Sequence, residues 1–388
     1  MEGQGGAQTY WGGRNLNTLW VEVNLSAIAW NLRKVKGLLP EETGLMAVVK
    51  ANGYGSGSIE PALTAIEVGA SCLGVFRVEE GLELRRAGIV APILIMKPLN
   101  PEEAEIMLDY DLIATLDSME GSSSLARVAE RKGKEAYVHV KVDTGMGRFG
   151  VRPEESLPFL QSLKSLSFLR IEGIYTHLAS AFYRDAQARH QLDLFQRVLD
   201  SIAQEGLLPP IRHAANSAAI LAYPDSAMDM VRVGNLLFGI CPFPRCFKAC
   251  PLMEGGSCAL RPTWEMKARI ISIKKVRRGT KVGYGGRFVA KRDSLIATLP
   301  VGLADGFGLE VVEEGSKGIL KAGVRTLGFF RPSVTFRGKR LGVAGRIGLQ
   351  ASAVDVSGFS EVKLGEEVLI EARRTAVGRH VPRIYLRG

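Results

Sequence analysis

Residues 45–240 alternate between short apolar, β-branched runs and longer stretches with helical periodicity. The apolar runs lie at 45–51, 72–76, 93–97, 112–116, 136–143, 171–178, 211–217 and 230–234. Strands separated by helices pair in parallel, and eight such units close into a (β/α)8 barrel. An open, doubly wound sheet is the alternative, but no G-x-G-x-x-G follows the first run. The alternation therefore predicts an α/β fold built on a TIM barrel.

The character of the sequence changes after about residue 250. Strand-like stretches separated by glycine-rich turns lie at 264–276, 294–302, 333–341 and 366–373. This pattern is typical of a mostly antiparallel β domain. A chain of 388 residues is also too long for one ordinary core. We therefore predict a flexible N-terminal arm at 1–17, a barrel at 18–250 and a mostly β domain at 251–388.

Composition and charge narrow the class of protein. The chain is 46% hydrophobic and 23% charged, which is typical of a soluble globular protein. Its net charge of +10 is spread along the chain without a basic tract, which argues against a nucleic-acid-binding protein. No run reaches the roughly 18 apolar residues that span a bilayer, and the first residues lack the apolar core of a secretory signal. We expect a cytoplasmic protein without membrane contact.

Four of the five cysteines cluster near the end of the predicted barrel. They are Cys241, Cys246, Cys250 and Cys258, separated by four, three and seven residues. Four thiolates suit zinc, but the paired C-x-x-C spacing of structural zinc sites is absent. We therefore predict loop thiols and no metal, with a zinc site as the alternative.

The chemically distinctive residues fall where a barrel places function, at the carboxyl ends of its strands. They are Lys50, Tyr54, Arg148, His177, Asn216, Ser217 and Arg232. Each alone has an ordinary interpretation, because a strand-end lysine is usually solvated and a lone histidine usually belongs to the core. Their shared location at one barrel mouth favours a functional site.

The loops after the seventh and eighth strands commonly bind phosphate in barrels. The segment HAANSAAI puts Ser217 where a helix begins, so its hydroxyl and free helix amides can hold a phosphate. Gly234 lets backbone amides approach the same group. An ordinary N-cap serine at Ser217 is the alternative.

A lysine, a phosphate site and an apolar barrel mouth together fit pyridoxal phosphate (PLP). Lys50 would bind the aldehyde, and the ring would act as an electron sink for charge at the substrate Cα. Arg232 cannot accept a proton, so the pyridine nitrogen beside it would stay unprotonated. A weaker electron sink suppresses side reactions and favours simple proton exchange.

The motifs resemble those of the alanine racemase family, in the family's order, from about residue 18 onward. They are AVVKANGYGSG, KVDTGMGRFG, YTHLAS, HAANSAA, MVRVG, KVGYGG, LPVGLADG and VPRIY. The resemblance implies a PLP-binding barrel with a C-terminal β domain. It also implies a head-to-tail homodimer whose active sites use both subunits, and a reaction that interconverts L- and D-alanine, supplying D-alanine for peptidoglycan.

The resemblance implies two catalytic residues. Lys50 would bind PLP and act on one face of Cα, and Tyr284 would reach in from the partner subunit to act on the other. Racemisation needs such a pair, because one group removes a proton and the other delivers one to the opposite face. A tyrosine with a pKa near 10 needs nearby cations to ionise, and His177 and Arg232 are the candidates.

The remaining binding roles are also implied by the resemblance. Arg148 would contact the PLP phenolic oxygen and the substrate carboxylate, and Lys141, if carbamylated, would orient Arg148. The backbone amide of Leu349 would contact the substrate carboxylate. The other cofactor-binding positions are Tyr54, His177, Asn216, Ser217, Arg232, Gly234 and Asn235.

Several departures from the family concern the rim of the pocket. Leu303 and Arg379 stand where tyrosines are usual, and Gln350 stands where an acid is usual. Gly53 and Ser56 replace an alanine and a histidine, and a helical segment of about 25 residues before VPRIY is absent. A wider pocket leaves open a racemase of other or broad specificity, acting on serine, lysine or ornithine.

Two further classes are disfavoured by particular residues. A PLP decarboxylase of the same barrel type needs a carboxylate at the ring nitrogen and a Cys-Asp motif, whereas this chain has Arg232 and GLQAS. A non-enzymatic PLP carrier would not need an opposing acid–base group, so Tyr284 argues against that interpretation.

Overall fold

The computed structural model describes residues 10–11, 14–183, 185–243, 251–254, 257–309 and 332–388. The chain forms two compact units. The barrel unit comprises Leu25–Gly53 and Ser58–Thr263, and the β unit comprises the described parts of Met1–Asn24, Tyr54–Gly57 and Trp264–Gly388. These limits differ from the predicted 18–250 and 251–388. The strand-forming residues before Leu25 and the segment 54–57 belong to the β unit, and the barrel unit continues to Thr263.

Eight parallel strands form the sheet of the barrel unit, as predicted. In spatial order it runs β10-β9-β8-β7-β6-β5-β4-β11. The strands are β4 (Gly44–Val48), β5 (Cys72–Val75), β6 (Ile93–Pro98), β7 (Ile113–Leu116), β8 (Ala136–Lys141), β9 (Leu169–Tyr175), β10 (Ile211–His213) and β11 (Met230–Val233). Every residue of β5, β7 and β11 is buried. Burial on both faces explains why these strands appear in the sequence as continuous apolar runs.

Backbone hydrogen bonds bring the two ends of the sheet together. The Asp229 amide donates to Arg212 O over 3.1 Å, and the Arg232 amide donates to Ala215 O over 3.0 Å. The eight strands therefore form a nearly closed barrel. β10 is shorter than predicted because the chain leaves the strand after His213 and enters a helix at Ser217.

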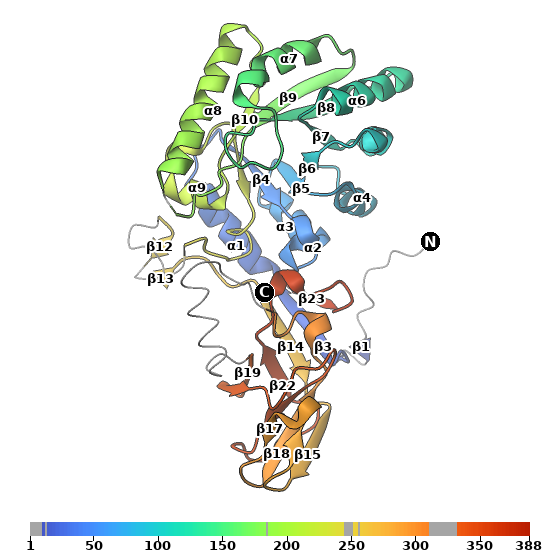
Figure 1. Cartoon of the computed structure of the whole chain (residues 1–388), viewed down its shortest axis with the longest axis vertical. Coiled ribbons are helices and arrows are strands. Elements are labelled where there is room, and N and C mark those ends of the chain that lie inside the picture. The colour runs from blue at the N-terminus through green and yellow to red at the C-terminus, as the bar shows by residue number, and fades with distance from the viewer. Residues whose placement is uncertain (1–9, 12–13, 184, 244–250, 255–256, 310–331) are drawn as a thin grey trace. The chain divides into compact units, whose positions relative to one another are not determined.

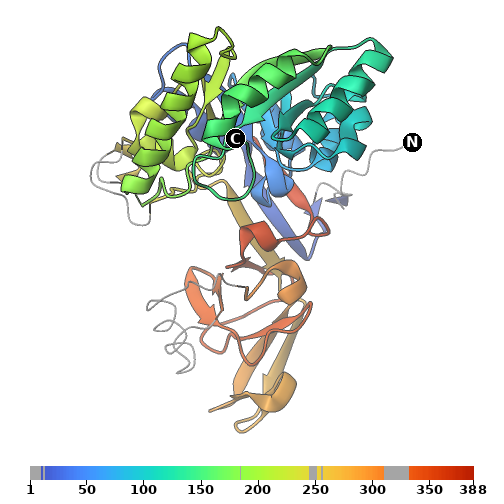
Figure 2. The same ribbon diagram turned by 45° about the horizontal axis from the view of Figure 1, so that its top comes forward.

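Helices surround the strands of the barrel unit (Figures 1 and 2). They are α1 (Leu25–Lys36), α3 (Ile59–Glu67), α4 (Val78–Arg86), α5 (Ala104–Asp109), α6 (Met119–Lys132), α7 (Ser156–Lys164), α8 (Ala186–Gln204) and α9 (Ser217–Ala222). In α8, the Asp185 side chain caps the first turn by accepting from the Ala188 amide. The buried residues Leu192, Phe195 and Leu199 recur at helical spacing, which holds this helix against the sheet.

The β unit contains a six-stranded sheet and a three-stranded sheet. The six-stranded order is β20-β19-β22-β14-β3-β23, and the three-stranded order is β15-β18-β21. Their strands are β3 (Leu19–Asn24), β14 (Trp264–Arg269), β15 (Ser272–Val276), β18 (Ser294–Leu299), β19 (Ser333–Phe336), β20 (Lys339–Gly342), β21 (Ser352–Asp355), β22 (Glu367–Ile370) and β23 (Arg383–Leu386). All pairs are antiparallel except β3 with β23. The predicted C-terminal β domain is confirmed.

Short elements complete the described chain. They are β1 (Tyr10–Trp11), β2 (Arg14–Asn15), β12 (Met253–Glu254), β13 (Ser257–Cys258), β16 (Lys281–Val282), β17 (Phe288–Val289), and the 3-10 turns η1 (Pro101–Glu103), η2 (Pro153–Glu155), η3 (Pro224–Ser226), η4 (Tyr284–Gly286), η5 (Leu303–Asp305) and η6 (Arg374–Ala376). Residues 1–9 and 12–13 of the predicted flexible arm lie outside the described residues. The described remainder of the arm includes the antiparallel pair β1–β2.

The cysteine cluster is only partly described. Cys241 is half-buried, whereas Cys246 and Cys250 lie outside the described residues. Within the described ranges, no group of three or more His, Cys, Asp or Glu side chains is arranged to hold a metal ion. Nor does any helix in those ranges combine the length and apolar character needed to cross a bilayer.

Candidate active site

The chain turns left-handed directly after Lys50, at the carboxyl end of β4. In α2 (Lys50–Tyr54), φ and ψ are 53° and 50° at Ala51, 54° and 50° at Asn52, and 58° and 43° at Gly53. This region costs an L-residue roughly 1–2 kcal/mol. Strain of this kind clusters at functional sites, where the surrounding structure holds it in place. The turn marks the loop after Lys50 as a specialised part of the barrel mouth.

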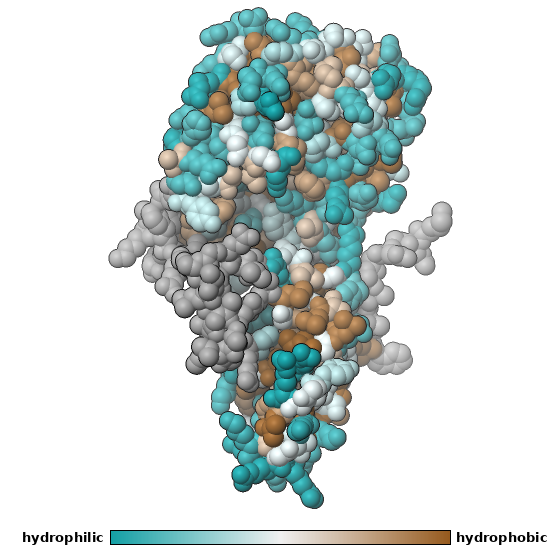
Figure 3. All heavy atoms as spheres, in the orientation of Figure 1, coloured by the Kyte–Doolittle hydropathy of each residue, from teal (hydrophilic) through white to brown (hydrophobic). Residues whose placement is uncertain are grey.

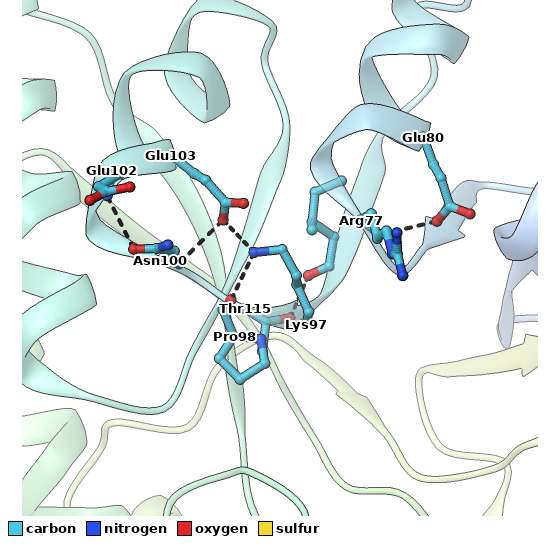
Figure 4. Close-up of polar contacts among 9 residues, drawn as sticks. Arg77, Glu80, Lys97, Pro98, Asn100, Glu102, Glu103 and Thr115 are labelled. Carbon is cyan, nitrogen blue, oxygen red and sulfur yellow. Dashed lines mark hydrogen bonds and ion pairs between the residues drawn. The ribbon is translucent and has the colours of Figure 1, made fainter.

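Three barrel strands carry a lysine at or beyond their carboxyl ends, and their surroundings differ. Lys97, in β6, forms an ion pair with Glu103, as Figure 4 shows. Lys141, at the end of β8, donates to Val142 O over 2.6 Å. In the described part of the chain, no hydrogen bond or ion pair reaches Lys50 Nζ, which lies 5.8 Å from the centre of the Phe76 ring. Among these three amines, Lys50 is the one available for chemistry.

The surroundings of Lys50 favour its neutral form. Burial lowers the pKa of Lys50, and the positive charges of Arg148 and Arg232 lower it further, while Glu80 acts in the opposite direction. The neutral amine is the nucleophilic form. The lowered pKa therefore makes Lys50 better suited than an ordinary lysine to attack an aldehyde.

Arg232 is buried at the end of β11, with 4% of its surface exposed. Its Nη1 donates to His213 O over 3.0 Å, and its Nη2 donates to Thr176 O over 2.7 Å and to Ala214 O over 3.0 Å. Burial lowers the pKa of Arg232 to about 10, so the guanidinium remains charged at neutral pH. Its hydrogen-bond partners are carbonyl oxygens and imidazole nitrogens, and no carboxylate contacts it among the described residues.

The hydrogen-bonding pattern of Arg232 leaves one donor available. A guanidinium has five N–H groups, and the four on Nη1 and Nη2 face protein acceptors. The described part of the chain offers no acceptor to Nε–H. This donor fits a pyridine nitrogen, which accepts a hydrogen bond without being protonated. The donor set at β11 is thus compatible with PLP.

His177, beyond the end of β9, is neutral in this setting. Burial lowers the pKa of His177 well below its ordinary value, and the charges of Arg232, Lys141, Lys50 and Arg148 act in the same direction. Its Nδ1 lies 3.4 Å from Nη2 of Arg232. This lowered pKa favours Arg232 over His177 as the cation that helps Tyr284 to ionise.

Asp143 shapes the loop that carries Arg148. Its Oδ1 accepts hydrogen bonds from the amides of Gly145, Met146 and Gly147 at 2.8–3.2 Å. These bonds lower the pKa of Asp143 although burial opposes them, so the carboxylate stays ionised. Arg148 itself is exposed, and its guanidinium carbon lies 5.4 Å from the centre of the Phe149 ring. Asp143 thus orders the backbone of the loop, and the exposed guanidinium of Arg148 is accessible to an anion.

Lys141 is almost completely buried, with 2% of its surface exposed. Its pKa is lowered to about 7, chiefly by burial and also by Arg232 and Arg148, against the opposing effect of Asp143. Nζ lies 5.9 Å and 5.6 Å from the ring centres of Phe149 and Tyr175. A large fraction of this amine is neutral at pH 7, which is the form that reacts with carbon dioxide.

The predicted phosphate-binding segments lie next to each other in the barrel unit. Ser217 Oγ accepts hydrogen bonds from the amides of Gly234, over 3.1 Å, and Leu236, over 3.4 Å. Asn235 lies between them and accepts at its carbonyl from the Phe238 amide, which closes a tight turn after β11. The hydroxyl and the glycine that the sequence singled out are therefore directly bonded.

The side chain of Asn216 caps the first turn of α9. Its Oδ1 accepts from the amides of Ala218 and Ala219, both over 3.0 Å, and its Nδ2 donates to Leu178 O. Two helix amides that we expected to be free are therefore capped. The side chain of Asn216 thus connects the start of α9 to the segment that follows β9.

Tyr54 belongs to a four-residue segment that the β unit holds tightly. Tyr54 O accepts from Arg374 Nε over 3.0 Å, and Gly55 O accepts from Arg383 Nη2 over 3.2 Å. Gly55 and Gly57 have φ of 85°, and a Cβ atom on Gly57 would lie 1.9 Å from the hydroxyl oxygen of Tyr385. Glycine is therefore required where the loop passes this ring.

Tyr284 and Leu349 lie in exposed parts of the β unit. Tyr284 begins the turn η4 and is 75% exposed, and Leu349 is 69% exposed. The Leu303 amide donates to Gly348 O and the Ala304 amide donates to Leu349 O, both over 3.0 Å. The unusual rim residue Leu303 and the expected substrate contact Leu349 thus lie on loops that are bonded to each other.

Sequence reasoning missed three residues that shape these loops: Glu80, Asp143 and Arg374. An acidic pair at a helix start and the D-x-G pattern at 143–145 are weak signals, because such residues cap helices and turns in any protein. Arg374 gave no local signal, since its partners Tyr54 and Ser56 are distant in the sequence.

The described residues of the barrel mouth fit PLP in the chemistry of their donors. An unpaired amine suits the aldehyde, an arginine N–H suits the ring nitrogen, and a serine beside a glycine turn suits the phosphate. The expected assignments of Lys50, Arg232, Ser217 and Gly234 are therefore mutually compatible within one unit.

Comparison with known proteins supports the same assignment. Residues 23–242 match the alanine racemase N-terminal domain, and residues 263–381 match the alanine racemase C-terminal domain. The chain is 38% identical to the alanine racemase of Desulforamulus reducens over 91% of this chain and 89% of that protein. It is 36% identical to the alanine racemase of Desulfovibrio desulfuricans over 95% of this chain and 98% of that protein.

Solved structures resemble the whole chain. The alanine racemase of Clostridium difficile 630 has a TM-score of 0.86 and 30% identity, covering 96% of this chain and 97% of its own. That of Bacillus anthracis with bound L-Ala-P has a TM-score of 0.83 and 29% identity, covering 96% of each chain. Both domain matches, the curated relatives and these structures agree, and the chain belongs to the alanine racemase family.

Proposed function

We propose that the protein is a PLP-dependent alanine racemase that interconverts L- and D-alanine, with Lys50 and Tyr284 as opposing acid–base groups. The observation that carries the proposal is the unpaired amine of Lys50 at the barrel mouth, with its lowered pKa. Membership of a PLP-dependent family and relatives named alanine racemases support it. The product would serve peptidoglycan synthesis.

Bound PLP supplies the electron sink that makes the Cα proton of an amino acid acidic. Lys50 Nζ binds the cofactor and moves the proton on one face of Cα. Arg232 would donate Nε–H to the ring nitrogen without protonating it, because a guanidinium is too weak an acid to give its proton to a pyridine. The chain thereby limits the sink and favours return of the proton to Cα.

Tyr284 acts on the opposite face, from a second copy of the chain. Its exposure supports this role, since a residue that serves a partner's site must be accessible in one chain. Figure 3 shows apolar residues at the surface of the β unit. Ile271, Val289, Leu303 and Leu349 are exposed there. Such residues are suited to be buried in a homodimer, which we propose as the active form.

The remaining proposed residues bind the anionic groups of the cofactor and the substrate. Ser217 with the turn at Gly234 and Asn235 holds the phosphate, together with the Tyr54 hydroxyl. Arg148 binds the phenolic oxygen of PLP and the substrate carboxylate, and the amide of Leu349 adds a second contact to that carboxylate. The pKa of Lys141, near 7, supports its carbamylation, which would give Arg148 an anionic partner.

A racemase of broader specificity is the second candidate. The bonded loops of Leu303 and Leu349 favour it, because these apolar side chains are 43% and 69% exposed. Gln350, beside them, is also exposed and carries no charge. A rim of this composition offers room for side chains longer than a methyl group.

A direct assay decides between the two candidates. Purified protein with PLP is offered single L-amino acids in deuterated water, and Cα exchange and D-product are measured by mass spectrometry and chiral chromatography. The proposal expects the highest kcat/KM with alanine. Higher values with serine, lysine or ornithine would establish the broader racemase, and no racemisation of any amino acid would refute the class.

A further inference from the structure

Glu80 connects the loops after two neighbouring barrel strands through both of its carboxylate oxygens. It lies in the first turn of α4 and is 8% exposed. Its Oε1 accepts from the Ala51 amide over 2.6 Å, and its Oε2 accepts from the amides of Phe76 and Arg77 over 2.9 and 3.0 Å. Figure 4 shows its carboxylate directed toward Arg77.

Two of these three bonds are local, because Phe76 and Arg77 lie directly before the helix that carries Glu80. A glutamate at the third position of a helix commonly accepts from the backbone amide of the cap residue, here Arg77. The bond to Ala51 has no such explanation, because Ala51 is 29 positions away, in the loop after β4. The carboxylate is therefore shared between the start of its own helix and the loop that carries Lys50.

The bond to Ala51 falls at the first residue of the left-handed turn. Ala51 follows Lys50 directly, and its amide belongs to the peptide unit that contains the Lys50 carbonyl. A hydrogen bond to this amide orients that peptide plane and so the Cα–Cβ direction of Lys50. Hydrogen bonds to an ionised acceptor are roughly twice as strong as neutral ones, which suits a turn with an intrinsic cost.

We propose that Glu80 is a positioning residue for the reaction, which aims the Lys50 amine at the cofactor and at the substrate Cα by fixing the Ala51 amide. The inference rests on the proposed role of Lys50. Glu80 touches neither cofactor nor substrate. Its negative charge also opposes the lowering of the pKa of Lys50.

The test compares Glu80→Gln and Glu80→Asp with Glu79→Gln in the PLP-loaded enzyme. Glu79 is an exposed neighbour in the same helical turn, so its replacement removes the same charge without touching the loop. Glutamine keeps the size of the side chain and weakens its acceptors, while aspartate keeps the charge and is too short to reach Ala51. The readouts are visible circular dichroism per bound PLP, kcat and KM for alanine, and hydrogen exchange of the peptide covering 47–57.

For both Glu80 variants we expect a changed visible dichroism, faster exchange in 47–57, and a kcat at least tenfold lower with little change in KM, since misplacing a catalytic group acts on the chemical step. Glu79→Gln should match the unmodified protein in all three. Glu80 variants that bind PLP with unchanged dichroism, exchange and kcat would overturn the positioning role. Hydrogen exchange of 47–57 in cofactor-free protein tests the bond to Ala51 even if Lys50 proves not to bind PLP, so the two proposals can fail separately.

Discussion

Nη1 of Arg232 lies 2.9 Å from Nδ1 of His213. Because arginine only donates, His213 accepts at Nδ1 and carries its proton on Nε2. That nitrogen lies 2.9 Å from Nδ1 of His139, which must accept in turn and carry its own proton on Nε2. The guanidinium at the barrel mouth thus fixes the tautomers of two buried rings in sequence. Nε2 of His139 is buried and has no partner among the described residues.

Replacing His213 should destabilise the barrel. His213→Ala removes an acceptor from a buried guanidinium and a ring stacked 4.7 Å from the ring of Tyr175, so we expect the free energy of unfolding to fall by about 3 kcal/mol. The control is His190→Ala, which removes an exposed ring of α8. Urea unfolding of both variants checks the prediction, and equal stabilities would contradict it.

Stability should decline below pH 6.5. Burial lowers the pKa of His139 to about 3 and holds the pKa of His177 and His213 well below 6.5, so the unfolded chain binds protons that the folded chain does not. The stabilisation is complete above pH 6.5 and is lost as the pH falls toward 3, at up to about 1.4 kcal/mol per pH unit for each histidine. Urea unfolding between pH 7 and 5 measures the slope. A His139→Gln, His213→Gln double variant should show a shallower slope, and an unchanged one would refute the assignment.

Two lysine variants should separate the cofactor-binding amine from its neighbours. Lys50→Ala should abolish the visible absorption of covalently bound PLP, because it removes the unpaired amine. Lys97→Ala should keep it, because Lys97 is paired with Glu103. Absorption spectra after gel filtration with PLP provide the measurement. Loss of absorption in the Lys97 variant alone would indicate that Lys97, in β6, binds the cofactor.

Tyr284→Phe should separate proton exchange from racemisation. The two enantiomers have equal energy, so kcat/KM must fall equally in both directions. With only Lys50 left to move a proton, one enantiomer should still exchange its Cα proton with deuterated water while keeping its configuration. The other enantiomer should lose exchange, and nuclear magnetic resonance of each separately records both outcomes. Equal exchange of both would contradict a mechanism with two opposing groups.

Arg374→Ala should weaken PLP binding. Arg374 holds Tyr54 O and Ser56 Oγ, and its loss frees the segment that presents the Tyr54 hydroxyl. We expect the Kd for PLP to rise about tenfold, which is the effect of losing one charge-assisted hydrogen bond. The matched control is its exposed neighbour in Arg373→Ala, whose guanidinium contacts only Thr375 within the described residues. Titration of each variant with PLP, followed by protein fluorescence, compares the two. Similar affinities would exclude a role for Arg374 in PLP binding.

Local patterns predicted most of the fold but not the limits of its units. The barrel strands are buried on both faces and follow one another in sequence. Each therefore appears in the sequence as an apolar run followed by a helical pattern. β3 left a similar run, but its partners β14 and β23 lie hundreds of residues away. Sheet membership depends on pairing, which no window of sequence contains. That is why 18–24 was assigned to the barrel.

The same difference between local and long-range features applies to the residues of the site. Lys50 and Arg232 could be predicted because their strand ends determine where they lie. The cap that Asn216 forms could not be predicted, because asparagine caps a helix in some proteins and binds a ligand in others. The left-handed turn after Lys50 could not be predicted either, since it begins at Ala51 and alanine seldom adopts that conformation.

The pairing of β3 has a consequence during translation. β3 is made before all the barrel strands, yet both of its neighbours, β14 and β23, are made after them. The barrel strands between them pair mostly with the strand just made, so the barrel can assemble while synthesis continues. Throughout that time Val21 and Val23, which are fully buried in the finished protein, have no sheet to join. The nascent chain therefore carries β3 without a sheet partner until β14 has been made, and the apolar side chains of this strand stay exposed for that interval.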